Sequence, residues 1–76
     1  MKMMSIKNDK INDTYTIKHG INGVIIGRSS VSFLGSSVDD SVKVSFNSTH
    51  VTVIKPNASY GADGGWWRFI IFYVQN

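Results

Sequence analysis

Hydrophobic and polar residues alternate one by one over three short segments, residues 14–19, 41–46 and 50–55. A period of two is typical of strands that bury one face and expose the other. The inward positions that this alternation predicts are Tyr15, Ile17, Val42, Val44, Phe46, Val51 and Val53. Residues 47–49 separate the second and third segments by a tight turn, so we expect these two segments to form a hairpin.

A second hairpin is predicted where Asn22-Gly23 separates residues 14–19 from the apolar segment that runs from Val24 to about Leu34. Asn-Gly suits a type I′ turn, because both central residues of that turn need a positive φ. Gly27 interrupts the second arm. A glycine within a strand indicates a β-bulge or a bend.

The segment from Trp66 to Val74 is apolar on both faces. One face carries Trp66, Arg68, Ile70, Phe72 and Val74, and the other carries Trp67, Phe69, Ile71 and Tyr73. A strand of this kind is normally central in a sandwich or barrel, or it packs against another subunit. Because adjacent residues face opposite sides, one tryptophan is expected in the core and the other at least partly on the outer face.

The remaining organisation is simple. Residues 1–12 are predicted to be a short strand, begun by Met4 and Ile6, or a loosely packed arm. No repeat or linker divides the chain, so we expect residues 1–76 to form a single small β domain. The predicted fold class is all-β, a small antiparallel barrel or compact sandwich of five to six strands.

Composition supports this fold class. The chain has no glutamate, one leucine and two alanines, but nine isoleucines, eight valines and nine aromatic residues. Hydrophobic residues make up 42% and charged residues 17%, which is not typical of disorder. A chain of 76 residues builds only a marginal core, and without cysteine it has neither disulfides nor thiolate metal sites. We therefore expect self-association as a homo-oligomer, or binding of a partner.

The formal net charge of +3 permits an acidic partner, including nucleic acid. The lysines of the predicted strands, Lys18, Lys43 and Lys55, are spread over three of them. The longest apolar run has nine residues and contains Arg68, which is too short for a membrane span. The N-terminal residues lack a signal-peptide pattern, so the expected location is the cytoplasm.

Few residues suggest catalysis. His19 and His50 are far apart in sequence and have no cysteine or glutamate nearby, so we expect no metal site. Asp39-Asp40 could combine with His50 and a serine, but no nucleophile motif accompanies them. The expectation is a protein that is not an enzyme and that uses no cofactor.

The clearest functional signal follows the glycine-rich segment 57–65. Tryptophan and tyrosine are frequent where a surface must both exclude water and form hydrogen bonds. The candidate partner-binding residues are Tyr60, Asp63, Trp66, Trp67, Arg68 and Phe72. The predicted function is a small stoichiometric protein-binding module, which means an inhibitor, adaptor or assembly component such as a phage or bacterial accessory protein.

Two alternative functions use the same aromatic residues. A single-stranded nucleic-acid-binding barrel would stack bases on exposed aromatic rings beside basic residues. A carbohydrate-binding module would stack a sugar on a tryptophan while Asp63 and a nearby asparagine accept hydrogen bonds from its hydroxyl groups.

Overall fold

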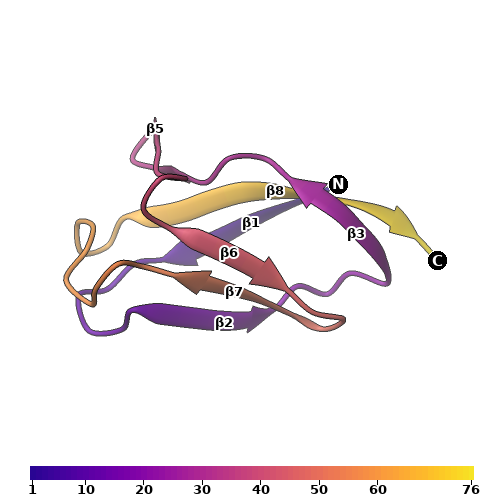
Figure 1. Ribbon diagram of the computed structural model, residues 1–76, viewed down its shortest axis with the longest axis horizontal. Helices are drawn as coiled ribbons and strands as arrows, with labels where there is room; N and C mark the ends of the chain where they lie inside the picture. The colour runs from indigo at the N-terminus through magenta and orange to yellow at the C-terminus, as the bar shows by residue number, and fades with distance from the viewer.

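The longest strand, β8 (Trp66–Gln75), lies at the centre of the larger of two antiparallel sheets (Figure 1). The computed structural model describes residues 1–76 and contains eight strands and no helix. Sheet A contains β8 together with β1 (Lys2–Lys7), β3 (Gly23–Arg28), β4 (Ser32–Phe33) and β5 (Ser36–Ser37). Sheet B has the order β2 (Thr14–Lys18), β7 (His50–Ile54), β6 (Lys43–Phe46). The predicted all-β fold class is confirmed. The structure has eight strands and not the five to six expected, because residues 32–33 and 36–37 form a separate short hairpin.

Both edges of β8 are paired, which confirms its predicted central position. On one edge it pairs with β1, from Lys7 opposite Trp66 to Lys2 opposite Ile71. On the other edge it pairs first with β4 and then with β3, where Val24 lies opposite Val74. Within residues 1–12, residues 2–7 form the short strand that was one of the two expectations: every residue of β1 pairs with β8, and β1 buries Met4 and Ile6.

Sheet B has the facing that the alternation predicts. The β6–β7 hairpin pairs Val44 with Val53 and Phe46 with Val51, and these side chains point toward sheet A. The side-chain oxygen of Asn47 accepts hydrogen bonds from the backbone N–H groups of Thr49 and His50, at 2.9 and 2.6 Å. This asparagine closes the turn.

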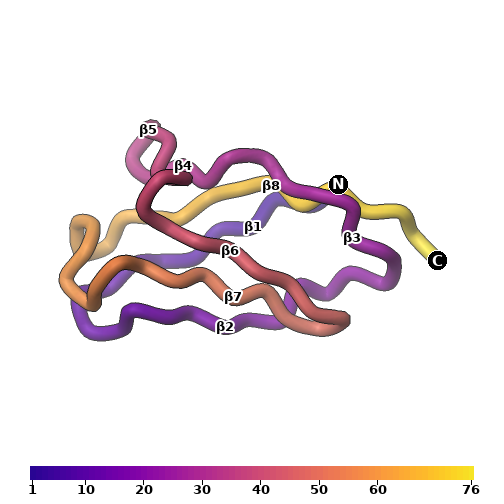
Figure 2. Tube along the Cα trace, in the orientation of Figure 1, coloured from indigo at the N-terminus to yellow at the C-terminus, as the bar shows by residue number.

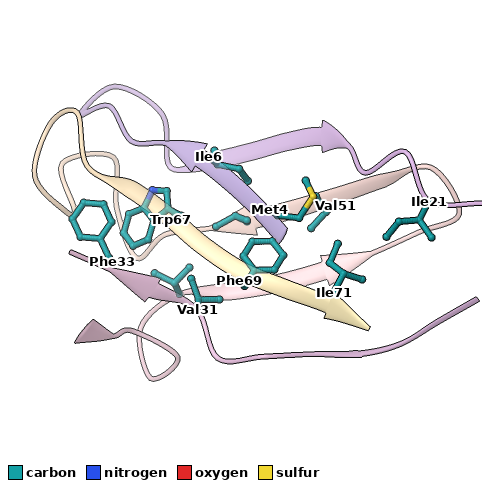
Figure 3. Packing of buried hydrophobic residues seen from close by; sticks show 11 residues of the cluster. Met4, Ile6, Ile21, Val31, Phe33, Val51, Trp67, Phe69 and Ile71 are labelled. Carbon is teal, nitrogen blue, oxygen red and sulfur yellow. The ribbon is translucent and has the colours of Figure 1, made fainter. Parts of the chain in front are cut away.

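The core lies between the two sheets and contains eleven buried hydrophobic residues. These are Met4, Ile6, Ile21, Val31, Phe33, Val42, Val51, Val53, Trp67, Phe69 and Ile71 (Figure 3). The chain passes from sheet B to sheet A between β2 and β3, and it returns between β5 and β6 (Figure 2). Residues of these two connections, Ile21 and Val42, are also buried in the core.

The predicted hairpin at Asn22-Gly23 is wrong. β2 pairs with β7, and the chain then crosses to the other sheet. Gly20, which has a positive φ of 68°, lies in this crossover. Gly23 is already part of β3, where a Cβ atom would collide with the backbone carbonyl of Val74. The glycine is required by close approach of two strands and not by a turn, and burial of Ile21 outweighs the local turn preference.

The predicted irregularity at Gly27 is confirmed. The register of β3 against β8 shifts between Ile25 and Gly27, which lie opposite the adjacent residues Tyr73 and Phe72. One residue, Ile26, is thus left over in a β-bulge. Ser29 continues the contact beyond β3, because its hydroxyl oxygen accepts a hydrogen bond from the Ile70 N–H at 2.8 Å.

Candidate protein-binding surface

The two tryptophans at the start of β8 lie on opposite faces of sheet A, as the alternation predicts. Trp67 has no exposed surface and points toward sheet B together with Phe69 and Ile71 (Figure 3). Trp66 is 41% exposed on the outer face. Trp66 is therefore the tryptophan that a partner can reach without disturbing the core.

Trp67 is held at one end of the core by aromatic neighbours. Its ring centroid lies 4.1 Å from that of Phe33 and 6.0 Å from that of Tyr60, and the Tyr60 ring is nearly parallel to it. Gly65 is buried beside this group. Only glycine fits at this position, because the Phe33 ring occupies the place that a Cβ atom would take. Trp67 thus belongs to the interior, the half-buried Tyr60 packs against it, and neither lines the groove beside Trp66.

A buried polar cluster around Asn8, which the sequence pattern did not predict, forms a hydrogen bond with the indole N–H of Trp67. The side-chain oxygen of Asn8 accepts hydrogen bonds from Trp67 Nε1 at 3.2 Å, Tyr15 Oη at 3.0 Å and Lys55 Nζ at 2.9 Å. The amide nitrogen of Asn8 donates to the carbonyls of Tyr60 and Ala62. Asn8, directly after β1, therefore holds segment 57–65 in place just before β8 begins.

Lys55 is the second unexpected member of this cluster. It is only 3% exposed, and its ammonium also donates to the backbone carbonyls of Asp9 and Ala58, both at 2.9 Å. A buried ammonium is stable when oxygen atoms satisfy its donors in this way. Lys55 is thus absent from the exposed surface, whereas Lys18 and Lys43 remain on the outer face of sheet B.

Asp63 is exposed in segment 57–65, on the side of Tyr15. Burial raises the pKa of the Tyr15 hydroxyl, and the nearby carboxylates of Asp9 and Asp63 act in the same direction. Neither Asp63 nor Tyr60 lines the groove that contains Trp66. The structure therefore separates these two candidates from Trp66 and Arg68.

Trp66 and Arg68 line a small groove of about 190 Å³ on the outer face of sheet A. We call this the Trp66 groove, and its lining residues are Ser32, Leu34, Gly35, Trp66 and Arg68. Leu34 is exposed and has a positive φ of 52°, in the turn that joins β4 to β5. The groove therefore combines an aromatic side chain, an aliphatic side chain and a cation.

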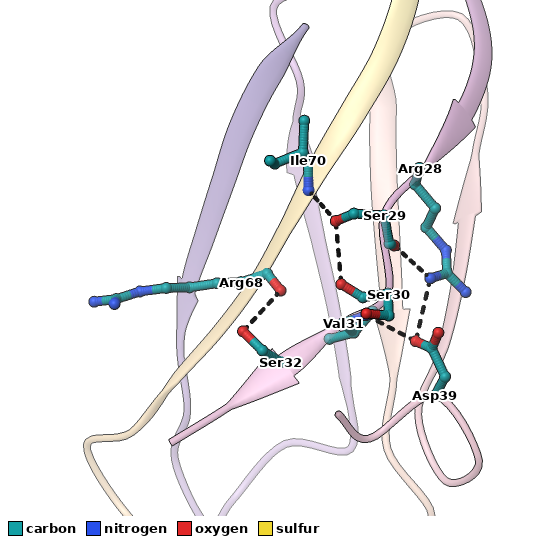
Figure 4. Close-up of polar contacts among 8 residues, drawn as sticks. All are labelled: Arg28, Ser29, Ser30, Val31, Ser32, Asp39, Arg68 and Ile70. Atoms are coloured by element: carbon teal, nitrogen blue, oxygen red, sulfur yellow. Dashed lines mark hydrogen bonds and ion pairs between the residues drawn. The ribbon is translucent and has the colours of Figure 1, made fainter. Parts of the chain in front are cut away.

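The charges beside the groove are unpaired. The one ion pair of the protein joins Arg28 to Asp39 at 3.2 Å, and Asp39 also accepts a hydrogen bond from the Val31 N–H (Figure 4). The side chain of Arg68 extends away from these residues and makes no hydrogen bond (Figure 4). Lys7, opposite Trp66 in the register of β1, also has no side-chain partner. Both cations are thus free to bind an anionic group.

Phe72 lies on the same outer face but six residues farther along β8. It is half-buried, and the exposed side chains around it are Met3, Val24, Ile26 and Val74. We call this surface the apolar strip, and its residues are Met3, Val24, Ile26, Ile70, Phe72 and Val74. The candidate residues on the outer face are therefore divided between two ends, with Trp66 and Arg68 at one end and Phe72 at the other.

The largest cavity, about 400 Å³, lies elsewhere, between β3 and the β6–β7 turn. His19 borders it, and the side chain of His19 is buried with both ring nitrogens engaged. Nδ1 accepts a hydrogen bond from the Ile21 N–H at 3.0 Å, and Nε2 lies 2.9 Å from the Asn47 carbonyl. Because Nδ1 is an acceptor, the ring proton lies on Nε2, and His19 holds the crossover against the turn.

The other candidate catalytic residues do not form a constellation. Asp39 contacts Arg28, whereas His50 Nδ1 lies 2.7 Å from the hydroxyl of Thr49. Neither Asp39 nor Asp40 forms a hydrogen bond or ion pair with His50. No three side chains of the metal-ligating types gather at one place.

Comparisons of this chain with protein-family models, with curated protein sequences and with solved structures found no match. The structure has no helix that is long and apolar enough to cross a membrane.

Proposed function

We propose that this chain is a small protein-binding module that acts stoichiometrically in the cytoplasm, as an inhibitor, adaptor or assembly component. The observation that supports this function most strongly is the placement of Trp66. A large aromatic side chain is 41% exposed in a groove beside Leu34 and Arg68, while its neighbour Trp67 completes the core.

Tryptophan and arginine are enriched among the residues that dominate the binding energy of protein interfaces. Arg68 and Lys7 have no partner within the chain, so they can pair with carboxylates at the rim of an interface. The groove has a volume of about 190 Å³, below the roughly 300–1,000 Å³ of pockets that enclose small molecules, so it fits a protein surface better than a small substrate.

The test is a binding titration with a matched control. A host protein captured by the wild-type chain is purified and titrated by isothermal titration calorimetry against wild type, Trp66→Ala and Ile54→Ala. Ile54 is also 41% exposed, but it lies in sheet B. We expect one partner per chain, a loss of at least about 30-fold in affinity for Trp66→Ala, and no change for Ile54→Ala. Equal loss in both variants, or none in either, would remove the Trp66 groove as the site.

A single-stranded nucleic acid is a second candidate ligand, because Trp66 has two free cations beside it: Lys7 lies opposite it on β1, and Arg68 follows two residues later on β8. A base could stack on the indole while the cations contact phosphates. Burial of Lys55 weakens this alternative, since it removes one of the three strand lysines from the surface. Salt-dependent gel shifts with single strands test it, and an absence of binding at low salt would eliminate it.

The carbohydrate alternative has less support. A sugar stacked on Trp66 needs hydrogen-bonding groups beside it, and the sequence offers them in the segment around Tyr60 and Asp63. Neither of these residues lines the groove beside Trp66.

A further inference from the structure

The apolar strip, at the far end of the outer face from the Trp66 groove, is unusual for a surface of so small a protein. Its most exposed members are Met3, Val24, Ile26 and Val74, with exposed fractions between 58% and 67%. Val24 lies directly opposite Val74 in the register of β3 and β8, and Met3 lies opposite Ile70 in the register of β1 and β8. The strip is therefore a continuous surface across three neighbouring strands.

The β-bulge in β3 shapes this surface. The extra residue, Ile26, protrudes, whereas a Cβ atom on the adjacent Gly27 would meet no atom within 4 Å. Gly27 lies opposite the half-buried Phe72. A protruding isoleucine and a position without a side chain thus lie side by side on the same strand. A twofold contact is self-complementary, so such a step in the surface can pack against the same step of a second copy.

The charge distribution favours a second copy of this chain as the occupant. The apolar strip contains no ionisable side chain: Arg68 lies just beyond Ile70 on β8, and Lys7 lies farther away, opposite Trp66. Packing of one strip on another would therefore bring no like charges together and would leave no charge buried without a partner.

The size of the strip also fits a dimer. Its exposed side chains present on the order of 500 Å² of apolar surface, and a standard interface buries about 800 Å² per partner with up to about 65% of it apolar. The apolar strip can thus supply the non-polar centre of such an interface, and the polar side chains around it can supply the rim.

We infer that the apolar strip is the contact surface of a symmetric homodimer in which the outer face of sheet A packs on the same face of a second copy. This arrangement covers both faces of β8, whose residues are apolar on both sides. The inference is independent of the proposed function. Trp66 and Phe72 are six residues apart, about 20 Å along an extended strand. The strip borders the groove where Ile70 follows Arg68 on this face, so a dimer contact centred on Val24 and Val74 would leave Trp66, eight residues from Val74, at its edge.

The test measures mass against concentration by sedimentation equilibrium. Wild type is expected to reach twice the chain mass of 8.4 kDa. Val74→Lys places a charge in the strip and is expected to raise the dimer dissociation constant at least about 100-fold. Ile54→Lys adds the same charge to the outer face of sheet B, and this variant is expected to dimerise like wild type.

Ile26→Lys repeats the test at a position that is 67% exposed, in case Val74→Lys does not fold. A wild-type chain that stays monomeric at millimolar concentration would overturn the inference, and so would strip variants that dimerise as tightly as wild type. The two proposals can fail separately. Val74→Lys should still bind the protein partner through Trp66, and Trp66→Ala should still dimerise.

Discussion

Removal of the Asn8 side chain should be among the most destabilising single changes in this protein, although asparagine is rarely a core residue. In Asn8→Ala, the indole N–H of the fully buried Trp67 loses its hydrogen-bond acceptor. The buried ammonium of Lys55 loses one of its three acceptors, and Tyr15 keeps only its contacts with Asp9.

The magnitude follows from these losses. An orphaned buried N–H costs about 1–3 kcal/mol, and a lost hydrogen bond to a buried charge costs about 1.5–3 kcal/mol. Together they predict a loss of about 3–5 kcal/mol in the free energy of unfolding. A domain of this size has a total stability on the order of 4–11 kcal/mol, so Asn8→Ala should lose at least about a quarter of it.

The assay is urea denaturation followed by tryptophan fluorescence, which reports the environment of Trp67, and by circular dichroism. Asn12→Ala is the matched control. Its side chain is exposed and makes one side-chain hydrogen bond, to Asp9, so its stability should change by less than about 0.5 kcal/mol. A loss of less than about 1 kcal/mol in Asn8→Ala would refute the role given to the buried polar cluster.

Three further predictions concern the core, the crossover and acid stability. Trp67→Ala should lose about 3–5 kcal/mol of unfolding free energy, whereas Trp66→Ala should stay within about 1 kcal/mol of wild type. Equal losses in urea denaturation would contradict the assignment of the two tryptophans to opposite faces of β8. His19→Leu removes the acceptor of the Ile21 N–H, so its unfolding free energy should fall by about 1–3 kcal/mol, and an unchanged urea midpoint would show that this contact is unimportant. Backbone N–H groups of Asn12 and Ile11 hold the pKa of Asp9 well below its usual 3.8, so stability from this carboxylate is present above pH 3.8 and is lost as the pH falls toward the folded-state pKa. Acid titration of unfolding should therefore be flatter in Asp9→Asn, and identical curves would disprove this contribution.

Local alternation was sufficient to predict the parts of the fold that depend on neighbouring residues. The faces of β8, the β6–β7 hairpin and the irregularity at Gly27 all follow from the period of two and from the conformational freedom of glycine. These features need no knowledge of distant parts of the chain.

The features that could not be predicted depend on partners far away in the sequence. Gly23 was interpreted as a turn residue because nothing in its neighbourhood indicates that Val74 approaches it. Lys55 resembles any strand lysine, and only the fold brings it to Asn8, 47 residues away. The same holds for Tyr60, which alternation cannot assign to the interior because it lies outside any strand.

The protein-binding role of the outer face can be tested most directly with the two indole N–H signals in a ¹H–¹⁵N nuclear magnetic resonance spectrum, recorded while unlabelled partner is added. We expect the Trp66 signal to shift or broaden together with the amide signals of Leu34 and Arg68. The Trp67 signal should remain in place, because its N–H is bonded to Asn8 inside the core. Shifts confined to sheet B or to the cavity beside His19, with no change at Trp66, would show that the partner does not bind at the Trp66 groove.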